Sequence, residues 1–234
     1  MKTRRKRKIL KEDDLKKHVL GFYNAGREPA HRFKSWENCF IYFHWLKAHP
    51  NSIARNIDLA CLHLGFYLAS WGMYRGKSFL LKKSFQVHRK CIKELMKRKY
   101  SILWNSDVSS LSNPKSVKLL LTLITRLRKT YDHKMTDTLV TKILLGTMGC
   151  VPAYDRYFTE GCKQWNVKPI SNFNEQSLLS LIRFYQTNCK MFSQINKQID
   201  RRSIIPYPSM KLLDMFFWSV GSNRNYQKLE NAAA

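Results

Sequence analysis

Acidic residues are scarce in this chain. Only 16 Asp and Glu stand against 42 Lys and Arg in 234 residues, so the formal net charge is +26. This imbalance favours a polyanionic partner. Nucleic acid is the first choice, because each Lys or Arg on a phosphate releases condensed counterions. An anionic membrane surface is a second interpretation and packing within a ribosome a third, although 44% hydrophobic and 13% aromatic residues favour a self-sufficient core.

Cysteine pairs and long apolar runs are also lacking. The six cysteines fall singly, without a CxxC pair or a histidine at zinc-finger spacing, so we predict reduced core thiols and no zinc site. The apolar run LACLHLGFYLASWGMY carries His63 and ends at Arg75, which is short for a membrane span. No signal peptide is recognisable. We therefore expect a cytoplasmic protein with no membrane partner.

Several catalytic motifs are missing as well. There is no GxxxxGK loop for nucleotide hydrolysis, no serine nucleophile elbow and no cluster of metal ligands. We accordingly predict neither a metal nor a small-molecule cofactor. The oligomeric state is not fixed by the sequence.

Period-two alternation is scarce, whereas apolar residues recur at three- and four-residue spacing. The pattern predicts an all-α fold, a single globular multi-helix domain with two helical lobes flanking a cleft and divided by the polar loop at 105–115. We expect a mobile basic arm at 1–17, the nucleic-acid-binding or catalytic domain at 18–228, and a frayed tail or cloning remnant at 229–234. Predicted helices begin near Ser35, Ile53, Phe85, Asn113, Thr136, Pro152, Asn174 and Pro208.

The stretch TKILLGTMGCVPAYDRYF, residues 141–158, raises a separate question. Pro152 suits a first helical turn, and Asp155 then falls in that turn, where the helix dipole favours a carboxylate. A helix-terminal acid is the simplest interpretation. The aromatic neighbours of Asp155 indicate a buried acid instead, and Gly146 and Gly149 would let the backbone approach a phosphate.

The residues Lys142, Gly146, Gly149, Pro152 and Asp155 resemble the signature region of the helix-hairpin-helix DNA glycosylase superfamily. The LASWGMYRG and LGTMGCVPAYDRYF segments are also similar to those of a bacterial protein family. A relation to phage-defence glycosylases that excise bulky modified bases, such as glucosylated hydroxymethylcytosine, is suspected. The resemblance implies a hydrolase that cleaves the N-glycosidic bond of a flipped base in DNA.

In that hypothesis Asp155 is the catalytic carboxylate, because bond cleavage builds positive charge on the sugar. Lys142 is a candidate amine nucleophile if desolvated, and a solvated helix lysine otherwise. A flipped base needs aromatic faces to receive it. The candidate base pocket comprises Trp71, Tyr74 and Tyr154, although a helix end with aromatic core packing also explains SWGMYRG. The candidate phosphate contacts are Arg75, Gly146, Gly149, Arg156, Lys82, Lys83 and Arg89.

Two other functions remain open at this level. Arg128 and His133, in RKTYDH, have the spacing of a HEPN-like ribonuclease if both lie on a helix. A non-catalytic nucleic-acid-binding protein needs neither His133 nor Asp155. The basic stretches LLKKSFQVHRKCIKELMKRK and IRFYQTNCKMFSQINKQIDRR predict a phosphate-binding surface in every case.

Overall fold

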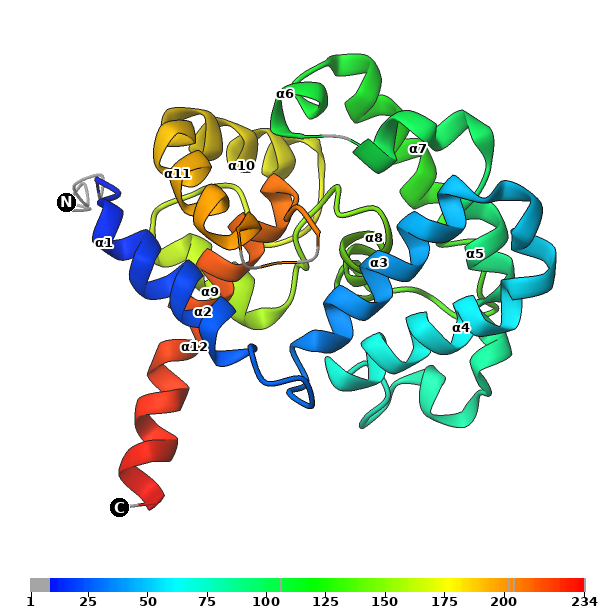
Figure 1. Cartoon of the computed structure of the whole chain (residues 1–234), viewed down its shortest axis with the longest axis horizontal. Coiled ribbons are helices and arrows are strands. Elements are labelled where there is room, and N and C mark those ends of the chain that lie inside the picture. The colour runs from blue at the N-terminus through cyan, green and yellow to red at the C-terminus, as the bar shows by residue number, and fades with distance from the viewer. Residues whose placement is uncertain (1–8, 106, 202, 204, 234) are drawn as a thin grey trace. The chain divides into compact units, whose positions relative to one another are not determined.

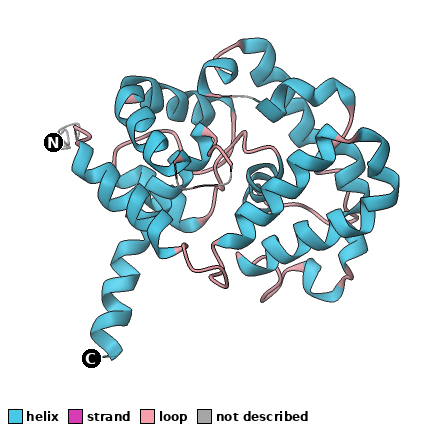
Figure 2. Cartoon of the chain, viewed as in Figure 1, coloured by secondary structure: helices cyan, strands magenta, loops and turns pink. Residues whose placement is uncertain are grey.

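The computed structural model describes residues 9–105, 107–201, 203 and 205–233. All regular elements among these residues are helices, and Figure 2 shows only helices and loops. The all-α prediction is confirmed. Its physical basis is the spacing of apolar residues, which places one stripe of each helix in a core.

The chain divides into two compact units, a central unit (Gly26–Ala153) and a terminal unit (Met1–Ala25 with Tyr154–Ala234). The predicted division at 105–115 is therefore wrong, because this loop lies inside the central unit. Within it a short helix, α6 (Val108–Leu111), buries Val108 and Leu111 and packs against the next helix. These two apolar side chains hold the polar loop against the core of its unit.

The central unit is built around one buried helix. Its elements are α3 (Lys34–Ala48), η2 (Pro50–Ser52), α4 (Ile53–Ser70), η3 (Phe79–Lys82), η4 (Phe85–His88), α5 (Arg89–Leu95), η5 (Arg98–Asn105), α6, α7 (Pro114–Leu127) and α8 (Asp137–Thr147). In α8 every residue from Leu139 to Thr147 is buried, and both α3 and α4 pack against it. Figure 1 shows α3 passing close to α8.

Two helices of the central unit begin, as predicted, just after a capping side chain. Asn113 caps α7 and Thr136 caps α8, as predicted, each accepting a backbone N–H of the first turn. Ser35 does not cap α3. It lies inside that helix, and its hydroxyl donates to the Arg32 carbonyl at 2.7 Å. The helix expected from Phe85 is divided into η4, α5 and η5.

The terminal unit contains α1 (Glu12–Leu15), η1 (Lys16–Leu20), α2 (Gly21–Ala25), α9 (Arg156–Gln164), α10 (Glu175–Thr187), α11 (Cys189–Asp200) and α12 (Ser209–Ala233). Asn174 caps α10 at its predicted start, and Asn188 separates α10 from α11. Helices α9 and α12 lie in backbone contact. A Cβ on Gly161 would stand 1.9 Å from the Phe217 carbonyl oxygen, so only glycine permits this packing.

The chain ends differ from expectation. Residues 1–8 of the predicted basic arm lie outside the described residues. Residues 9–17 of that arm are partly packed, since Leu10 and Leu15 are buried. At the other end α12 continues to Ala233, through residues predicted to fray.

One apolar groove opens between α3 and α4, with a volume of about 560 Å³. Four large apolar side chains around it are exposed: Trp45, Leu59, Leu62 and Phe66. No Lys or Arg of the described residues lines the groove, which distinguishes it from the basic surface described below. Among the described residues no helix is both long and apolar enough to cross a membrane.

Candidate nucleic-acid interface

Asp155 is the N-cap of α9, one position before the turn in which it was predicted. It is half-buried, and its Oδ1 accepts hydrogen bonds from the backbone N–H of Tyr157 at 3.1 Å and of Phe158 at 3.0 Å. Pro152 therefore precedes the helix instead of starting it. These contacts match the simpler interpretation of Asp155 as a helix-terminal acid, and a catalytic role stays a prediction.

The two glycines of this stretch are not open to a phosphate, which corrects the prediction for both. Gly146 is buried, and a Cβ there would stand 2.3 Å from the Tyr67 ring. Its missing side chain makes room for Tyr67. Gly149 is also buried and ends α8 at φ +68°, with its N–H bonded to the Leu144 carbonyl at 2.9 Å.

Lys142 is only 5% exposed, so the solvated alternative is wrong. Its Nζ donates to the backbone carbonyl of Trp71 at 2.8 Å, where α4 has just ended. The Trp71 ring stacks on Phe33, with centroids 5.3 Å apart, and the Arg32 guanidinium lies 5.4 Å from it. Lys142 thus ties α8 to the end of α4 within the central unit.

The other residues of the candidate base pocket are engaged in packing. Tyr154, in the terminal unit, is 4% exposed, and its hydroxyl shares a hydrogen bond with Ser177 at 3.1 Å. Trp71 and Tyr74 belong to the central unit. The Tyr74 hydroxyl bonds His88 Nε2 at 2.7 Å, and His88 Nδ1 bonds the Tyr131 hydroxyl at 2.7 Å. This tyrosine–histidine–tyrosine triad was not identified from the sequence, because its members are far apart along the chain.

Burial determines the charge state of the triad. His88 is fully buried, and desolvation lowers its pKa to about 4. Burial also raises the pKa of Tyr74 to about 12 and that of Tyr131 well above its ordinary value. All three are neutral at pH 7. One tyrosine consequently donates to the imidazole and the other accepts from it.

The triad predicts acid sensitivity. In the unfolded chain His88 gains its proton near pH 6.5, but in the folded protein only near pH 4, so stability is full above pH 6.5 and falls between 6.5 and 4. The loss from His88 is roughly 3 kcal/mol. His88→Gln keeps a donor and an acceptor without titrating. The free energy of unfolding in urea should depend less on pH in this variant than in the wild type. His133→Gln, at an exposed site, is the control and should keep the wild-type pH dependence. The same pH dependence in all three proteins would contradict the prediction.

Within the described residues the strongest concentration of positive charge is residues 75–99 of the central unit, here called the basic segment. It holds ten Lys and Arg but one acid, Glu94, and nine of the ten cations are exposed. The candidate contacts Arg75, Lys82 and Lys83 are among the nine. Within the described residues none of these three forms an ion pair. The tenth cation, Arg89, is only partly exposed and pairs with Asp58.

Glu94 does not cancel the charge of the basic segment. Its side chain is 11% exposed and lies beside Lys97 and, at 4.0 Å, Lys99. Burial raises its pKa, but hydrogen bonds from Lys97 and Tyr100 outweigh that effect, so the pKa lies below the ordinary value. Its single negative charge is thus matched within its own neighbourhood. Of the other cations, Arg89 pairs with Asp58 and Lys90 lies 3.8 Å from Asp132, and the rest face solvent.

The remaining cationic candidates lie apart from the basic segment. Arg156 is exposed in the terminal unit, with its guanidinium 4.9 Å from the Tyr157 ring. Arg128 and His133 follow the end of α7 at Leu127, so they do not share a helix as the ribonuclease hypothesis requires. Arg128 also pairs with Asp137.

The predicted core thiols are mostly confirmed, since five of the six cysteines are buried and only Cys189 is exposed. Burial raises the pKa of Cys91 and of Cys150 to about 12, which keeps both thiols protonated. Among the described residues no group of three or more His, Cys, Asp and Glu is placed to hold a metal ion. Comparison of the chain with protein-family models, curated proteins and solved structures finds no match.

Proposed function

We propose that this protein binds nucleic acid through the phosphate backbone, with the basic segment as its principal contact surface. The supporting observation is the exposure of nine cations in 25 residues whose one acid is already paired. Cations in such an arrangement replace counterions condensed on a polynucleotide, and this binding does not depend on base sequence. The net charge of +26 acts in the same direction over longer distances.

Binding of the full chain to fluorescein-labelled 20-mers, measured by anisotropy, tests this proposal. Single-stranded and duplex oligonucleotides should bind with Kd on the order of 1–100 μM at physiological salt, as for non-specific contacts. Anionic phospholipid vesicles form the comparison, because a membrane surface also attracts cations. Vesicle binding without oligonucleotide binding would contradict the proposal.

Base excision by Asp155 is a second, more specific proposal. It is supported by the resemblance of residues 142–155 and by the half-buried carboxylate between the aromatic residues Tyr154 and Tyr157. In this proposal the carboxylate stabilises positive charge on the sugar during base release. This step does not require Lys142, whose ammonium group donates to the Trp71 carbonyl.

Asp155→Asn separates the catalytic role from the capping role. Asn caps a helix about as well as Asp, so the variant should fold and bind oligonucleotide like the wild type. Base release should be abolished. The measurement is strand cleavage by alkali after incubation with plain and glucosylated DNA. Equal cleavage by the variant, or none by the wild type, would contradict the proposal and leave nucleic-acid binding intact.

A further inference from the structure

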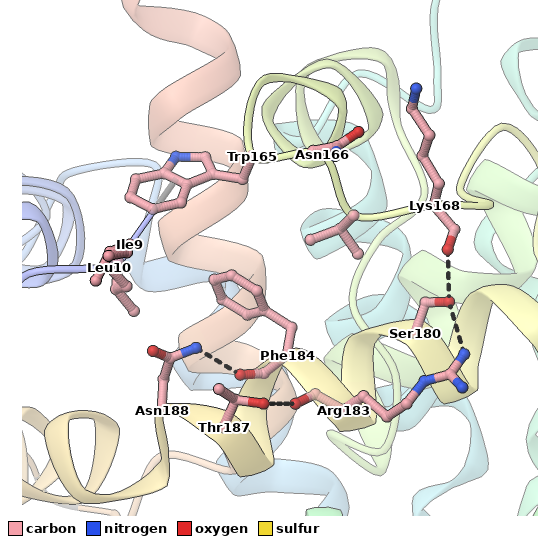
Figure 3. Close-up of a pocket in the computed structure, with 11 residues that line it drawn as sticks. Ile9, Leu10, Trp165, Asn166, Lys168, Ser180, Arg183, Phe184, Thr187 and Asn188 are labelled. Carbon is pink, nitrogen blue, oxygen red and sulfur yellow. Dashed lines mark hydrogen bonds between the residues drawn. The ribbon is translucent and has the colours of Figure 1, made fainter. Parts of the chain in front are cut away.

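A cavity of about 540 Å³ lies within the terminal unit, between the turn at 165–168 and the C-terminal half of α10, with Ile9 and Leu10 also in its lining. Figure 3 shows the rings of Trp165 and Phe184 on one side of it and the Arg183 guanidinium beside Ser180 on the other, while the Lys168 side chain points away from Arg183. Among the described residues no Asp or Glu lines this cavity. One side therefore offers aromatic surface, mostly from the half-buried Phe184 because Trp165 is only 6% exposed, and the other offers the positive charge of Arg183.

Hydrogen bonds fix the cavity walls. The Ser180 hydroxyl donates to the Lys168 carbonyl at 2.8 Å, which ties the turn to α10. Asn166 reverses the chain after α9 at φ +56°, a conformation that asparagine tolerates better than most residues. Asn188 Nδ2 donates to the Phe184 carbonyl at 2.8 Å and closes the end of α10. The cavity is thus part of the folded unit.

The two cations lack carboxylate partners within the described residues. The Arg183 guanidinium reaches the Ser180 hydroxyl at 3.4 Å, a long contact that leaves most of its N–H donors available. Both Arg183 and Lys168 are exposed. A ligand anion would gain charge-assisted hydrogen bonds here without displacing a protein carboxylate.

We propose that this cavity binds one nucleotide, with the base at the aromatic side formed by Phe184 and Trp165 and the phosphate at Arg183. A nucleoside phosphate combines the flat ring and the anion that the two sides require, and the volume is within the range of about 300–1,000 Å³ typical of ligand sites. Aromatic side chains receive any base through its π-face.

The nucleotide has two sources, a free nucleotide or an unstacked residue of a bound strand. Only the second source rests on the proposed function. The basic segment belongs to the other unit, so substitutions can separate the two sites.

Quenching of tryptophan fluorescence, with Trp165→Phe as reference, tests the inference in the full chain. The probes are adenosine monophosphate, adenosine, inorganic phosphate and a single-stranded 12-mer. Adenosine monophosphate should quench saturably and more tightly than adenosine or phosphate alone, and Trp165→Phe should lose this signal. Arg183→Ala should weaken binding about tenfold or more, as expected for a charged hydrogen bond. Arg201→Ala, also exposed and in the same unit but outside the cavity, is the matched control.

The outcomes distinguish a free nucleotide from a residue of a bound strand, and failure of this inference from failure of the proposed function. Saturation by the monophosphate assigns the site to free nucleotides, and quenching by the 12-mer alone assigns it to a strand; both support the inference. Absence of quenching by every probe, or an equal effect of Arg183→Ala and Arg201→Ala, would overturn it. Failure of the proposed function appears differently, as loss of oligonucleotide binding while the monophosphate still quenches.

Discussion

Replacing Gly161 with alanine is expected to destabilise the terminal unit by about 3 kcal/mol or more, at or beyond the upper end of overpacking effects. The new methyl group would stand 1.9 Å from the carbonyl oxygen of Phe217 in α12. Backbone cannot rotate away as a side chain can, so α9 and α12 must separate. A second close contact joins the same two helices, since a Cβ on Gly221 of α12 would stand 1.9 Å from the Tyr157 carbonyl oxygen of α9.

Gly21→Ala is the matched control for this prediction. Gly21 begins α2 in the same unit, and a Cβ there would meet nothing within 4 Å. This substitution should leave stability unchanged or raise it by up to about 1 kcal/mol, because alanine favours helix. Urea denaturation followed by circular dichroism measures both. Equal stability of the two variants would show that α9 and α12 do not pack at the distance described.

Reversing two charges of the basic segment is expected to have the largest effect on binding. Lys82→Glu with Lys83→Glu should weaken oligonucleotide binding about 100-fold at 0.05 M salt, since each lost phosphate contact removes nearly one power of the salt dependence. Both side chains are exposed, at the end of η3, so the fold should be retained. The loss should be similar for different base sequences.

The control reverses the same number of charges elsewhere. Lys190→Glu with Lys197→Glu changes two exposed lysines of α11, in the terminal unit and outside both the basic segment and the nucleotide cavity. We expect a smaller loss of oligonucleotide affinity than for the Lys82 and Lys83 pair, because this control changes only the net charge. If both pairs reduce affinity equally, the basic segment is not the principal contact surface.

The sequence predicted the helical class and the starts of α7, α8 and α10, because Asn113, Thr136 and Asn174 cap locally. It did not predict where the units divide, since Val108 and Leu111 attach the polar 105–115 loop through contacts that no local pattern encodes. The sequence left the burial of Lys142 open for a related reason. Its carbonyl partner on Trp71 lies 71 residues away in sequence.

The exposed cations of the candidate site could be predicted, because a run rich in Lys and Arg with few acids keeps its charged side chains in solvent. Arg75, Lys82 and Lys83 lie in a run with a single acid, and all three face solvent. Glycine was harder to interpret, because a missing side chain admits either a ligand or a neighbouring side chain. At Gly146 the neighbour is Tyr67. The cavity between Trp165 and Arg183 was not predicted, since a turn after α9 brings the two residues together.

The salt dependence of oligonucleotide affinity tests the central claim most directly. We expect log Kobs to fall linearly with log[NaCl] between 0.05 and 0.2 M, with a slope of about −5, as for some six phosphate contacts. The slope should become about two units shallower for the Lys82→Glu, Lys83→Glu protein. A flat dependence in the wild-type protein, or an unchanged slope in the variant, would contradict the claim that exposed cations of the basic segment hold the phosphate backbone.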